Sequence, residues 1–447
     1  MREKSDNVFY NIDWVIVLIF IALVTFGYMN VYSAVYIEGK SNIFSVSHEE
    51  SKQLIFGIIS IGLAFSILII DASFFTATAF ILYGGILFLN IIVRFLGSDV
   101  HGSHSWFKFG GISLQPAEFA KWATLLALAK YMSGVKGGDW KTGFLYPMGI
   151  ILLPVLIMIG IQNETGCAIV FVGLILVMYR ESMIPGWLIL LGLTFAAMFI
   201  IGIKYPGILV TNNGTEEVKQ LVYAFDTKAI IILVSVLVAV GILRLLFVRR
   251  TVKQILLTLA LTGIFSGTFL AAPVVLEKMP AHMNGRIKCW LGLPVSKEMH
   301  DRYAYNTEEA MIAIGSGGAW GKGYLQGTLT KQGFVPEQET DFIFCVVGEE
   351  WGWVGTTAVI LLYLILISRL LRMAERQRSD FTRIYGYGVA AVFFVHLIVN
   401  VGMDVGLIPV IGIPLPFFSY GGSSLISFTI LLFIFVKLDS QRLLVLR

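Results

Sequence analysis

Residues 306–355 read NTEEAMIAIGSGGAWGKGYLQGTLTKQGFVPEQETDFIFCVVGEEWGWVG and decide how the rest of the chain is interpreted. The stretch begins polar and rich in glycine, within a chain that is otherwise very apolar. From Phe342 onward it continues directly into an apolar run long enough to cross a membrane. Asp341 stands at this junction, and it is flanked by the carboxylates of Glu337, Glu339, Glu349 and Glu350.

Asp341 has two interpretations at this position. A carboxylate at the mouth of a membrane helix is costly to desolvate, so it usually faces water or a polar cavity and is a functional candidate. Alternatively, Thr340 and Asp341 cap the helix by accepting hydrogen bonds from amides at its N-terminus. The residues around the junction fit both interpretations equally.

The composition places the chain among membrane proteins. Hydrophobic residues make up 57% of the 447 residues, charged residues make up 14%, and the mean hydropathy is +0.80. This predicts an all-α, polytopic helical membrane protein. The net charge of +4 is small and spread between the helices, which argues against a nucleic-acid partner. The three cysteines show no metal-ligand spacing, and we expect no disulfide framework.

Apolar runs of membrane length predict about twelve transmembrane helices of roughly 20 residues each. They lie near residues 14–34, 53–71, 75–96, 116–133, 143–161, 167–180, 185–204, 229–248, 254–275, 342–368, 385–405 and 422–437. The first run lacks a small-residue cleavage site, so we interpret it as a membrane helix and not as a signal peptide. The segment 276–341 is expected to be a long loop before the third-last helix, and loops of this length are more often functional than passive.

The distribution of basic residues predicts the orientation of the helices. Under the positive-inside rule, both termini are cytoplasmic and the 276–341 segment lies on the opposite side. The basic residues that this orientation places in the cytoplasm are Arg2, Lys4, Lys130, Lys136, Lys141, Arg180, Arg249, Arg250, Lys253, Arg369, Arg372, Arg376, Arg378, Arg383, Lys437, Arg442 and Arg447. We therefore expect a multi-pass protein whose functional face points outward.

Glu118 and Lys121 are charged residues at the start of an apolar run. They lie three positions apart on one helix face, just after Gln115-Pro116, where proline fits a first helical turn. One interpretation is an ion pair that lowers the cost of burying both charges. The other is the wall of a polar cavity in the outer half of the membrane, which we favour because intramembrane charges tend to face cavities.

Two further polar groups have simple alternatives. Glu164, within the segment IQNETGCAIVF, separates two apolar runs, and by itself this pattern is typical of a tight turn. Arg286 and Lys288, within PAHMNGRIKCW, suit a phosphate or pyrophosphate ligand. An interfacial anchor formed with Trp290 fits those two residues as well.

The segment 400–424, NVGMDVGLIPVIGIPLPFFSYGGSS, cannot form a regular helix because of its prolines and glycines. Irregular backbone at membrane depth is tolerated only where it lines a cavity or is covered by protein. His396, in the preceding helix, is more typical of a packed or hydrogen-bonded residue than of a metal ligand. The glycine run Gly315–Gly318 resembles a phosphate cradle only weakly, and no established phosphate, metalloprotease or nucleophile motif is present.

Taken together, these segments resemble the SEDS family (shape, elongation, division, sporulation) of cell-wall glycosyltransferases, the RodA/FtsW group. The resemblance covers most of the chain, in family order, and Ile413 to Pro416 look more like the elongation branch than the division branch. The matching residues are Trp106, Gln115 to Lys121, Gln162 to Gly166, Ala313 to Gly318, Gly321 to Gly323, Pro336 to Phe344, Gly348 to Glu350 and Pro414 to Ser424.

The resemblance implies polymerisation of lipid II into glycan strands at the outer face of the bacterial cytoplasmic membrane during cell elongation. Asp341 matches the essential aspartate of the family and would take the proton from the acceptor 4-hydroxyl in an inverting transfer. Arg286, Lys288, Lys121 or a divalent cation such as Mg²⁺ or Mn²⁺ would stabilise the pyrophosphate leaving group. No metal-ligating residue is assigned. The implied substrate-binding residues are Lys121, Glu118, Arg286, Lys288, Glu164, Ser316, Lys322, Glu337 and Ser419.

The chain also departs from the family pattern. Glu339 stands where the family often has His, Glu164 where it usually has Asp, and Asp404 lies in a normally neutral stretch. Members typically have ten helices, so within a single domain of residues 1–447 we interpret 205–275 as an inserted helix pair. The segment 276–341 follows as the extracytoplasmic catalytic loop.

Two other functions compete with the transferase. A lipid II transporter (flippase) would place polar residues near the bilayer midplane, whereas here they gather at the outer edge, with Arg94 as the main exception. A scaffold would give no reason for the acidic, glycine-rich segment. The resemblance also implies a class B penicillin-binding transpeptidase and the cell-elongation machinery as partners.

Overall fold

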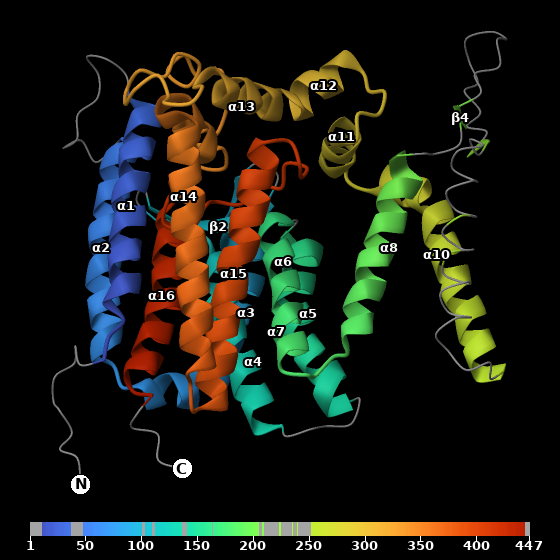
Figure 1. Cartoon of the computed structure of the whole chain (residues 1–447), viewed down its shortest axis with the longest axis horizontal. Helices are drawn as coiled ribbons and strands as arrows, with labels where there is room; N and C mark the ends of the chain where they lie inside the picture. The colour runs from blue at the N-terminus through green and yellow to red at the C-terminus, as the bar shows by residue number, and fades with distance from the viewer. Residues whose placement is uncertain are drawn as a thin grey trace. The chain divides into compact units, whose positions relative to one another are not determined.

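The computed structural model divides the chain into two compact units. The first comprises Met1–Ile184 with Tyr305–Arg447, and the second comprises Pro185–Ala304 (Figure 1). The prediction of a mainly helical membrane protein is confirmed. The structure describes residues 11–36, 48–100, 103–109, 112–135, 141–162, 164–204, 208–209, 223–224, 235, 239 and 252–442.

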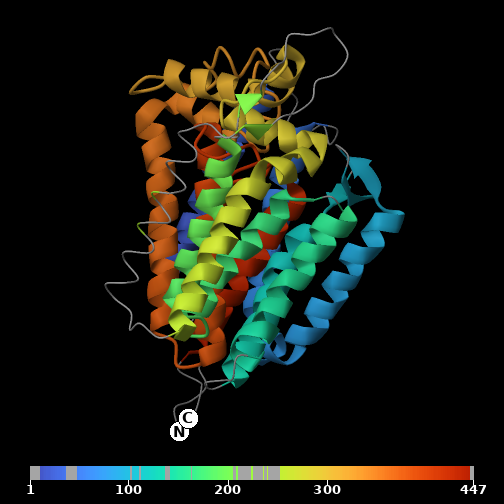
Figure 2. The same ribbon diagram turned by 90° about the vertical axis from the view of Figure 1, so that its right-hand side faces the viewer.

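The first unit is a bundle of helices that run side by side, with α13 lying across one end (Figures 1 and 2). Its helices are α1 (Trp14–Val35), α2 (Glu49–Ile69), α3 (Ala72–Leu96), α4 (Pro116–Gly134), α5 (Tyr146–Ile157), α6 (Gly166–Val170), α7 (Leu174–Arg180), α13 (Tyr305–Ser316), α14 (Ile343–Glu375), α15 (Asp380–Asp404) and α16 (Gly422–Ser440). Short turns of π-helix flank α5, at Lys141–Leu145 and Met158–Gln162, and a 3₁₀ turn at Phe171–Gly173 joins α6 to α7.

Eight helices among the described residues are long and apolar enough to cross a membrane. Large apolar side chains such as Leu18, Ile58 and Ile81 point away from the protein on these helices, as expected of a surface that faces lipid. The total of about twelve spans stays a prediction, because the run at 229–248 lies almost entirely outside the described residues.

A small antiparallel sheet joins α3 to α4, and the sequence analysis did not predict it. Its strands are β1 (Ser98–Val100), β2 (Ser103–Phe109) and β3 (Ile112–Leu114), in that order. Gly102, Gly110 and Gly111 interrupt the connection and disfavour a helix, so its backbone groups pair across strands. The hydroxyl of Ser423 in α16 accepts from the Gln115 amide (3.1 Å) and donates to the Ser113 carbonyl (2.9 Å). These bonds tie the end of the sheet to the start of α16.

The second unit contains α8 (Gly186–Lys204), α10 (Val252–Lys278), α11 (Ala281–Trp290) and α12 (Lys297–Tyr303). It also contains the two-stranded pair β4 (Ile208–Leu209) and β5 (Tyr223–Ala224). Two apolar clusters pack α8 against α10, and their buried members are Met198, Phe265 and Phe269 in one and Ile203, Ala272 and Leu276 in the other. The predicted loop 276–341 therefore needs a correction: α10 continues to Lys278, and α11, α12 and α13 occupy much of the rest.

A break in α14 explains the glycine-rich run before it. Gly352 adopts a left-handed conformation (φ 63°) inside the helix, which frees carbonyl groups of the preceding turn. The carbonyls of Glu349 and Glu350 accept from the amides of Lys322 and Gly323, each at 2.9 Å. The Gly318 carbonyl in turn accepts from Trp353 (2.9 Å). The glycines of this run thus let its backbone pack directly against the backbone of α14. This packing explains why the run is rich in glycine, and a bound phosphate is not needed to explain it.

Gly27 of α1 lies against the irregular segment that precedes α16. A Cβ atom at Gly27 would stand 2.6 Å from the Phe418 Cα atom and 2.7 Å from its carbonyl oxygen. Gly62 of α2, in contrast, would place its Cβ more than 4 Å from any neighbour. Packing therefore requires glycine at position 27, whereas position 62 has room for a larger side chain.

We predict that Gly27→Ala lowers the thermal unfolding midpoint in detergent, because overpacking at this contact costs about 1–3 kcal/mol. Gly62→Ala should leave the midpoint unchanged or raise it slightly, because alanine is the better helix former. Equal midpoints for the two variants would contradict the tight contact between Gly27 and Phe418.

Candidate active site

Asp341 lies in a tight turn directly before α14. The Glu337 carbonyl accepts hydrogen bonds from the amides of Thr340 (3.2 Å), Asp341 (3.1 Å) and Phe342 (3.2 Å). Glu337 itself has a φ of 57°, which is uncommon for a residue other than glycine. Because Phe342 occupies the N-cap position of α14, Asp341 precedes the cap. Its partly buried carboxylate is therefore presented from the turn.

Asn400 of α15 holds the backbone of Asp341 against the proline- and glycine-rich segment. Its carboxamide donates to the Asp341 carbonyl (2.8 Å) and to the Ile413 carbonyl (2.9 Å). On the side-chain side, a Cβ at Gly412 would stand 3.0 Å from Asp341 Oδ2. Residues 405–421 form no helix or strand, as their prolines and glycines predicted, whereas the ends of the predicted segment, 400–404 and 422–424, belong to α15 and α16. The catalytic candidate therefore rests directly on this irregular segment.

The turn that carries Glu164 meets the same segment. A Cβ at Gly166 would stand 2.7 Å from the Gly412 carbonyl oxygen, so the two backbones are in close contact. Glu164 accepts a hydrogen bond from the Ser105 hydroxyl of β2 (3.2 Å). The structure thus brings the segments of Asp341 and Glu164 together at Gly412, although about 180 residues separate them in the chain.

Lys121 and Glu118 form the ion pair that was one of the two predicted interpretations, at 2.7 Å. Lys121 Nζ also lies 3.2 Å from His396 Nε2, and the other ring nitrogen, Nδ1, is 2.9 Å from the Pro414 carbonyl. Because a carbonyl only accepts, Nδ1 is the donor and Nε2 accepts from the ammonium. His396 therefore links the ion pair to the irregular segment.

The favoured interpretation of Lys121 as part of a cavity wall is not supported. Both Lys121 and Glu118 are only 2% exposed, and the ammonium lies 4.3 Å from the centre of the Phe428 ring. The second oxygen of Glu118 accepts from the Cys167 thiol (3.3 Å). A buried charge is tolerated when it is paired and fully hydrogen-bonded, and this network meets that requirement. Direct substrate contact by either residue stays a prediction.

Ser419 and Tyr420 complete the irregular segment. The Ser419 hydroxyl accepts from the Leu415 amide (2.8 Å), and the Tyr420 amide donates to the Glu339 carbonyl (2.8 Å). Burial raises the pKa of Tyr420 to about 12, and the charges of Glu49 and Glu339 contribute. Burial also raises the pKa of Glu339, with a contribution from Glu49. The surroundings of the Asp341 turn are therefore acidic.

Glu349 organises the segment between α13 and α14, and the sequence analysis gave it no role. Its fully buried carboxylate accepts six hydrogen bonds, from Lys322 Nζ (2.5 Å), the amides of Thr328, Leu329 and Thr330 (2.9 Å each), and the hydroxyls of Thr328 (3.1 Å) and Thr330 (2.7 Å). A charged residue inside an apolar run needs polar partners, and this was the one feature of the sequence that could have pointed to the role of Glu349. Substrate binding by Lys322 stays a prediction.

Asp404, at the end of α15, is a second carboxylate near Asp341. It is fully buried. It interacts electrostatically with Asp341 and with the amides of Phe344 and Cys345 at the start of α14. In the sequence Asp404 stands out only as an unusual charge, since its position beside the Asp341 turn depends on how α15 packs on α14.

The other predicted site residues have separate surroundings. The Ser316 hydroxyl donates to the Ala313 carbonyl (2.8 Å) in the last turn of α13. The exposed Glu337 carboxylate accepts from the Thr340 hydroxyl (3.1 Å). Arg286 and Lys288 lie on α11 and belong to the second unit. Their contact with substrate stays a prediction.

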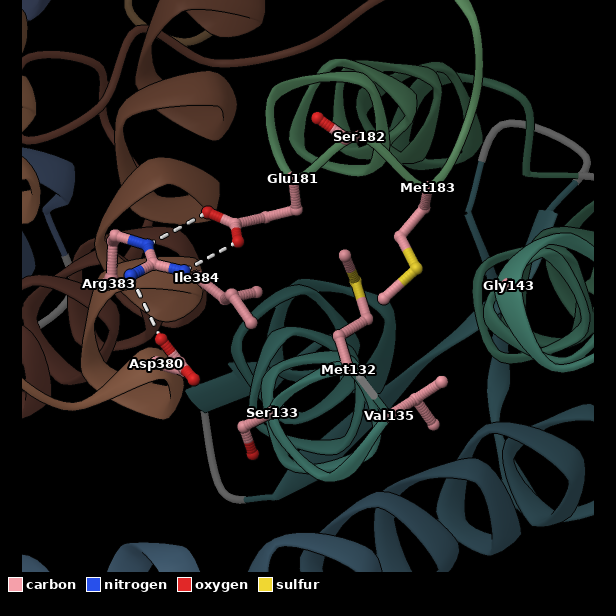
Figure 3. A pocket seen from close by; sticks show the side chains of 10 residues that line it. All are labelled: Met132, Ser133, Val135, Gly143, Glu181, Ser182, Met183, Asp380, Arg383 and Ile384. Atoms are coloured by element: carbon pink, nitrogen blue, oxygen red, sulfur yellow. Dashed lines mark hydrogen bonds and ion pairs between the residues drawn. The ribbon is translucent and has the colours of Figure 1, made fainter. Parts of the chain in front are cut away.

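A cavity of about 330 Å³ at the other end of the bundle is not part of this site (Figure 3). Its lining includes Met132 of α4, Glu181 after α7, and Asp380 and Arg383 of α15. Arg383 is paired with Glu181 (2.8 Å) and with Asp380 (2.9 Å). At about 1.5 Å per residue, the 25 residues of α15 place Asp380 about 36 Å from Asp404.

The fold and site define a polytopic helical membrane protein with a carboxylate-centred site where α14 begins. A family model described as "Cell cycle protein", for the FtsW, RodA and SpoVE proteins, matches residues 13–228 and 210–443. The chain therefore belongs to the FtsW/RodA/SpoVE family.

Individual relatives agree with this assignment. The chain is 31% identical over 423 residues to the peptidoglycan glycosyltransferase RodA of Treponema pallidum, covering 92% of this chain and 94% of the relative. It is 48% identical over 122 residues to the peptidoglycan glycosyltransferase MrdB of Escherichia coli, covering 27% and 33%. A solved structure from work on polymerization and crosslinking by a peptidoglycan synthase complex is similar with a TM-score of 0.66 and 23% identity, covering 96% of this chain and 98% of that one.

We predict that Glu349→Gln exposes residues 322–331 to trypsin. The substitution points an amide group at the N–H and O–H donors that the carboxylate now accepts, and loss of one charged hydrogen bond costs about 2 kcal/mol. Cleavage after Lys322 and Lys331 should therefore increase about thirtyfold, as measured by limited proteolysis and mass spectrometry.

The matched control is Glu375→Gln, which removes an exposed ion pair with Arg180. Exposed ion pairs contribute little to stability, so this control should be cut like the wild type. If Glu349→Gln were as resistant as the control, the carboxylate would not be what holds the segment.

Proposed function

We propose that this chain is a peptidoglycan glycosyltransferase that polymerises lipid II during cell elongation, with Asp341 as its general base. Membership of the family and relatives named as peptidoglycan glycosyltransferases support the reaction class. The observation that supports the base is the position of Asp341. Its backbone is held by Glu337 and Asn400, while its carboxylate lies at the junction of a turn, a helix start and an irregular segment.

The proposed chemistry needs one base and no covalent enzyme intermediate. The Asp341 carboxylate takes the proton of the acceptor 4-hydroxyl while that oxygen attacks the anomeric carbon of the donor. The bond from the anomeric carbon to the pyrophosphate oxygen breaks, and its electron pair leaves with the lipid-linked pyrophosphate. Because the backbone of Asp341 is held on two sides, little orientation has to be gained when substrate binds.

Other residues contribute at two levels in this proposal. Glu164 and Ser419 belong to segments that meet near Gly412, so they suit contacts with the sugars. Lys121 acts through His396, which holds the Pro414 carbonyl in place. Arg286 and Lys288 of the second unit are the proposed cationic partners of the pyrophosphate. Ser316, Lys322 and Glu337 remain proposed substrate contacts.

We further propose an outward-facing site in a bacterial cytoplasmic membrane, with both termini cytoplasmic, and a class B penicillin-binding transpeptidase as partner. The clustering of Lys and Arg at one end of the predicted helices supports the orientation. The likeness to a solved structure studied as part of a peptidoglycan synthase complex motivates the partner.

A resident divalent cation does not fit the residues that the structure describes. Among them no three His, Cys, Asp or Glu side chains are grouped so that they could hold a metal. A Mg²⁺ or Mn²⁺ ion would have to be bound mainly by the pyrophosphate of the substrate.

We predict that EDTA leaves the thermal unfolding midpoint of the purified protein unchanged. Added Mg²⁺ should raise the polymerisation rate of the chelated enzyme without a delay for refolding. A drop in the midpoint with EDTA alone would instead show a resident structural metal.

For Asp341→Asn, we expect polymerisation of lipid II to fall at least about 100-fold, because the amide cannot accept the proton. The measurement is glycan formation from purified lipid II, with and without the transpeptidase partner. The matched control is Glu298→Gln, an exposed residue of α12 that undergoes the same change of charge to amide.

Equal polymer from Asp341→Asn and the wild type would remove Asp341 from the chemistry. If the wild type formed no polymer even with its partner, and scrambled lipid in vesicles instead, the transporter function would replace the transferase.

A further inference from the structure

A groove on the outside of the first unit runs between α1 and α14, on the part of α14 that follows its break. Its volume is about 380 Å³, and the active-site candidates contribute nothing to it. The residues that line it are Val15 of α1 and Leu361, Leu364, Ile365, Ser368, Arg369 and Arg372 of α14. We call this feature the basic groove.

The residues of the basic groove are ordered like the parts of an amphiphile. Residues 361, 364, 365, 368, 369 and 372 recur at intervals of three and four, so they form one stripe along α14. The stripe extends for about 16 Å at the rise of an α-helix. Leu361, Leu364 and Ile365 are exposed at its apolar part, and Ser368 and the two arginines form its polar end.

The two arginines of the basic groove differ in how they are held. Arg369 forms an ion pair with the buried Asp13 (2.8 Å), which orients its partly exposed guanidinium. Asp13 also contacts Arg376 (3.3 Å), which is paired with Asp439 (2.5 Å). Arg372 is exposed and has no ion pair with any described residue. Asp13 offsets the charge of Arg369, so the uncompensated positive charge at the polar end of the groove is that of Arg372.

The apolar part of the groove belongs to the lipid-facing surface of two membrane-spanning helices. The exposed Trp14, next to Val15, is of the kind that anchors a helix at the membrane interface. The guanidinium of Arg372 therefore lies at the depth of lipid headgroups. A single apolar partner helix would leave the charge of Arg372 without a counter-charge, whereas a phosphate would neutralise it.

We propose that the basic groove binds an anionic phospholipid. One acyl chain lies along Val15, Leu361, Leu364 and Ile365, and the phosphate accepts hydrogen bonds from the Ser368 hydroxyl and from the guanidinium groups of Arg369 and Arg372. This site is independent of the transferase proposed above, because its evidence lies at the opposite end of α14 from Asp341.

Native mass spectrometry of the full chain in detergent, with added phosphatidylglycerol or phosphatidylcholine, tests the proposal. The wild type should retain phosphatidylglycerol in preference to phosphatidylcholine. Arg372→Gln should lower the affinity for phosphatidylglycerol about fivefold and leave that for phosphatidylcholine unchanged. The matched control, Arg378→Gln, alters another exposed arginine in the connection to α15, outside the groove, and should bind like the wild type.

A second variant tests the apolar part. Leu364→Trp fills the acyl-chain position while retaining both arginines, so it should reduce phosphatidylglycerol retention without changing the thermal unfolding midpoint. The proposal fails if Arg372→Gln binds phosphatidylglycerol as tightly as the wild type, or if Arg378→Gln loses as much affinity. It also fails if a single-span partner helix cross-links to Leu364 and lipid retention is the same with and without that partner.

Discussion

The structure depends on one constraint: the irregular backbone of residues 405–421 has no helix or strand in which to satisfy its polar groups. Side chains from neighbouring helices supply hydrogen bonds to its more buried part, residues 413–419. The donors to its carbonyl groups are Asn400 to Ile413, His396 to Pro414, Tyr363 to Pro416 and Gln53 to Ser419, and the Ser419 hydroxyl accepts from the Leu415 amide. Each bond fixes one point of the segment to α2, α14, α15 or the segment itself.

The same bonds assemble the candidate active site. Asn400 binds the carbonyl groups of Ile413 and Asp341 with one carboxamide, so the segment and the catalytic turn are held in register. His396 connects the segment to the buried pair of Lys121 and Glu118. The geometry of the site therefore depends on residues 405–421, which α2, α14 and α15 hold in place. A substitution that releases this segment displaces the site even when Asp341 itself is unchanged.

Charges inside this protein are stabilised in different ways, and only some were predictable. The pair of Glu118 and Lys121 follows from their spacing on one helix. Glu349 is stabilised by six donors, five from the backbone and hydroxyls of residues 328–330 and one from Lys322, and nothing in the local pattern indicates which segment supplies them. The sheet formed by β1, β2 and β3 was missed because β1 and β3 have only three residues each and β2, SHSWFKF, does not alternate strictly between apolar and polar residues.

The amino-acid sequence alone was sufficient for the membrane class, most helix positions and an irregular segment between the last two helices, because hydropathy and proline and glycine content are local properties. The interpretation of Asp341 as the base came from the family resemblance and stays a prediction. Only the tertiary structure decided four features: the hydrogen bonds of Asn400 to two carbonyl groups, the meeting of the Glu164 and Asp341 turns at Gly412, the burial of Lys121 and the role of Glu349. These features join residues far apart in the chain, and periodicity along one helix carries no information about which distant backbone packs against it.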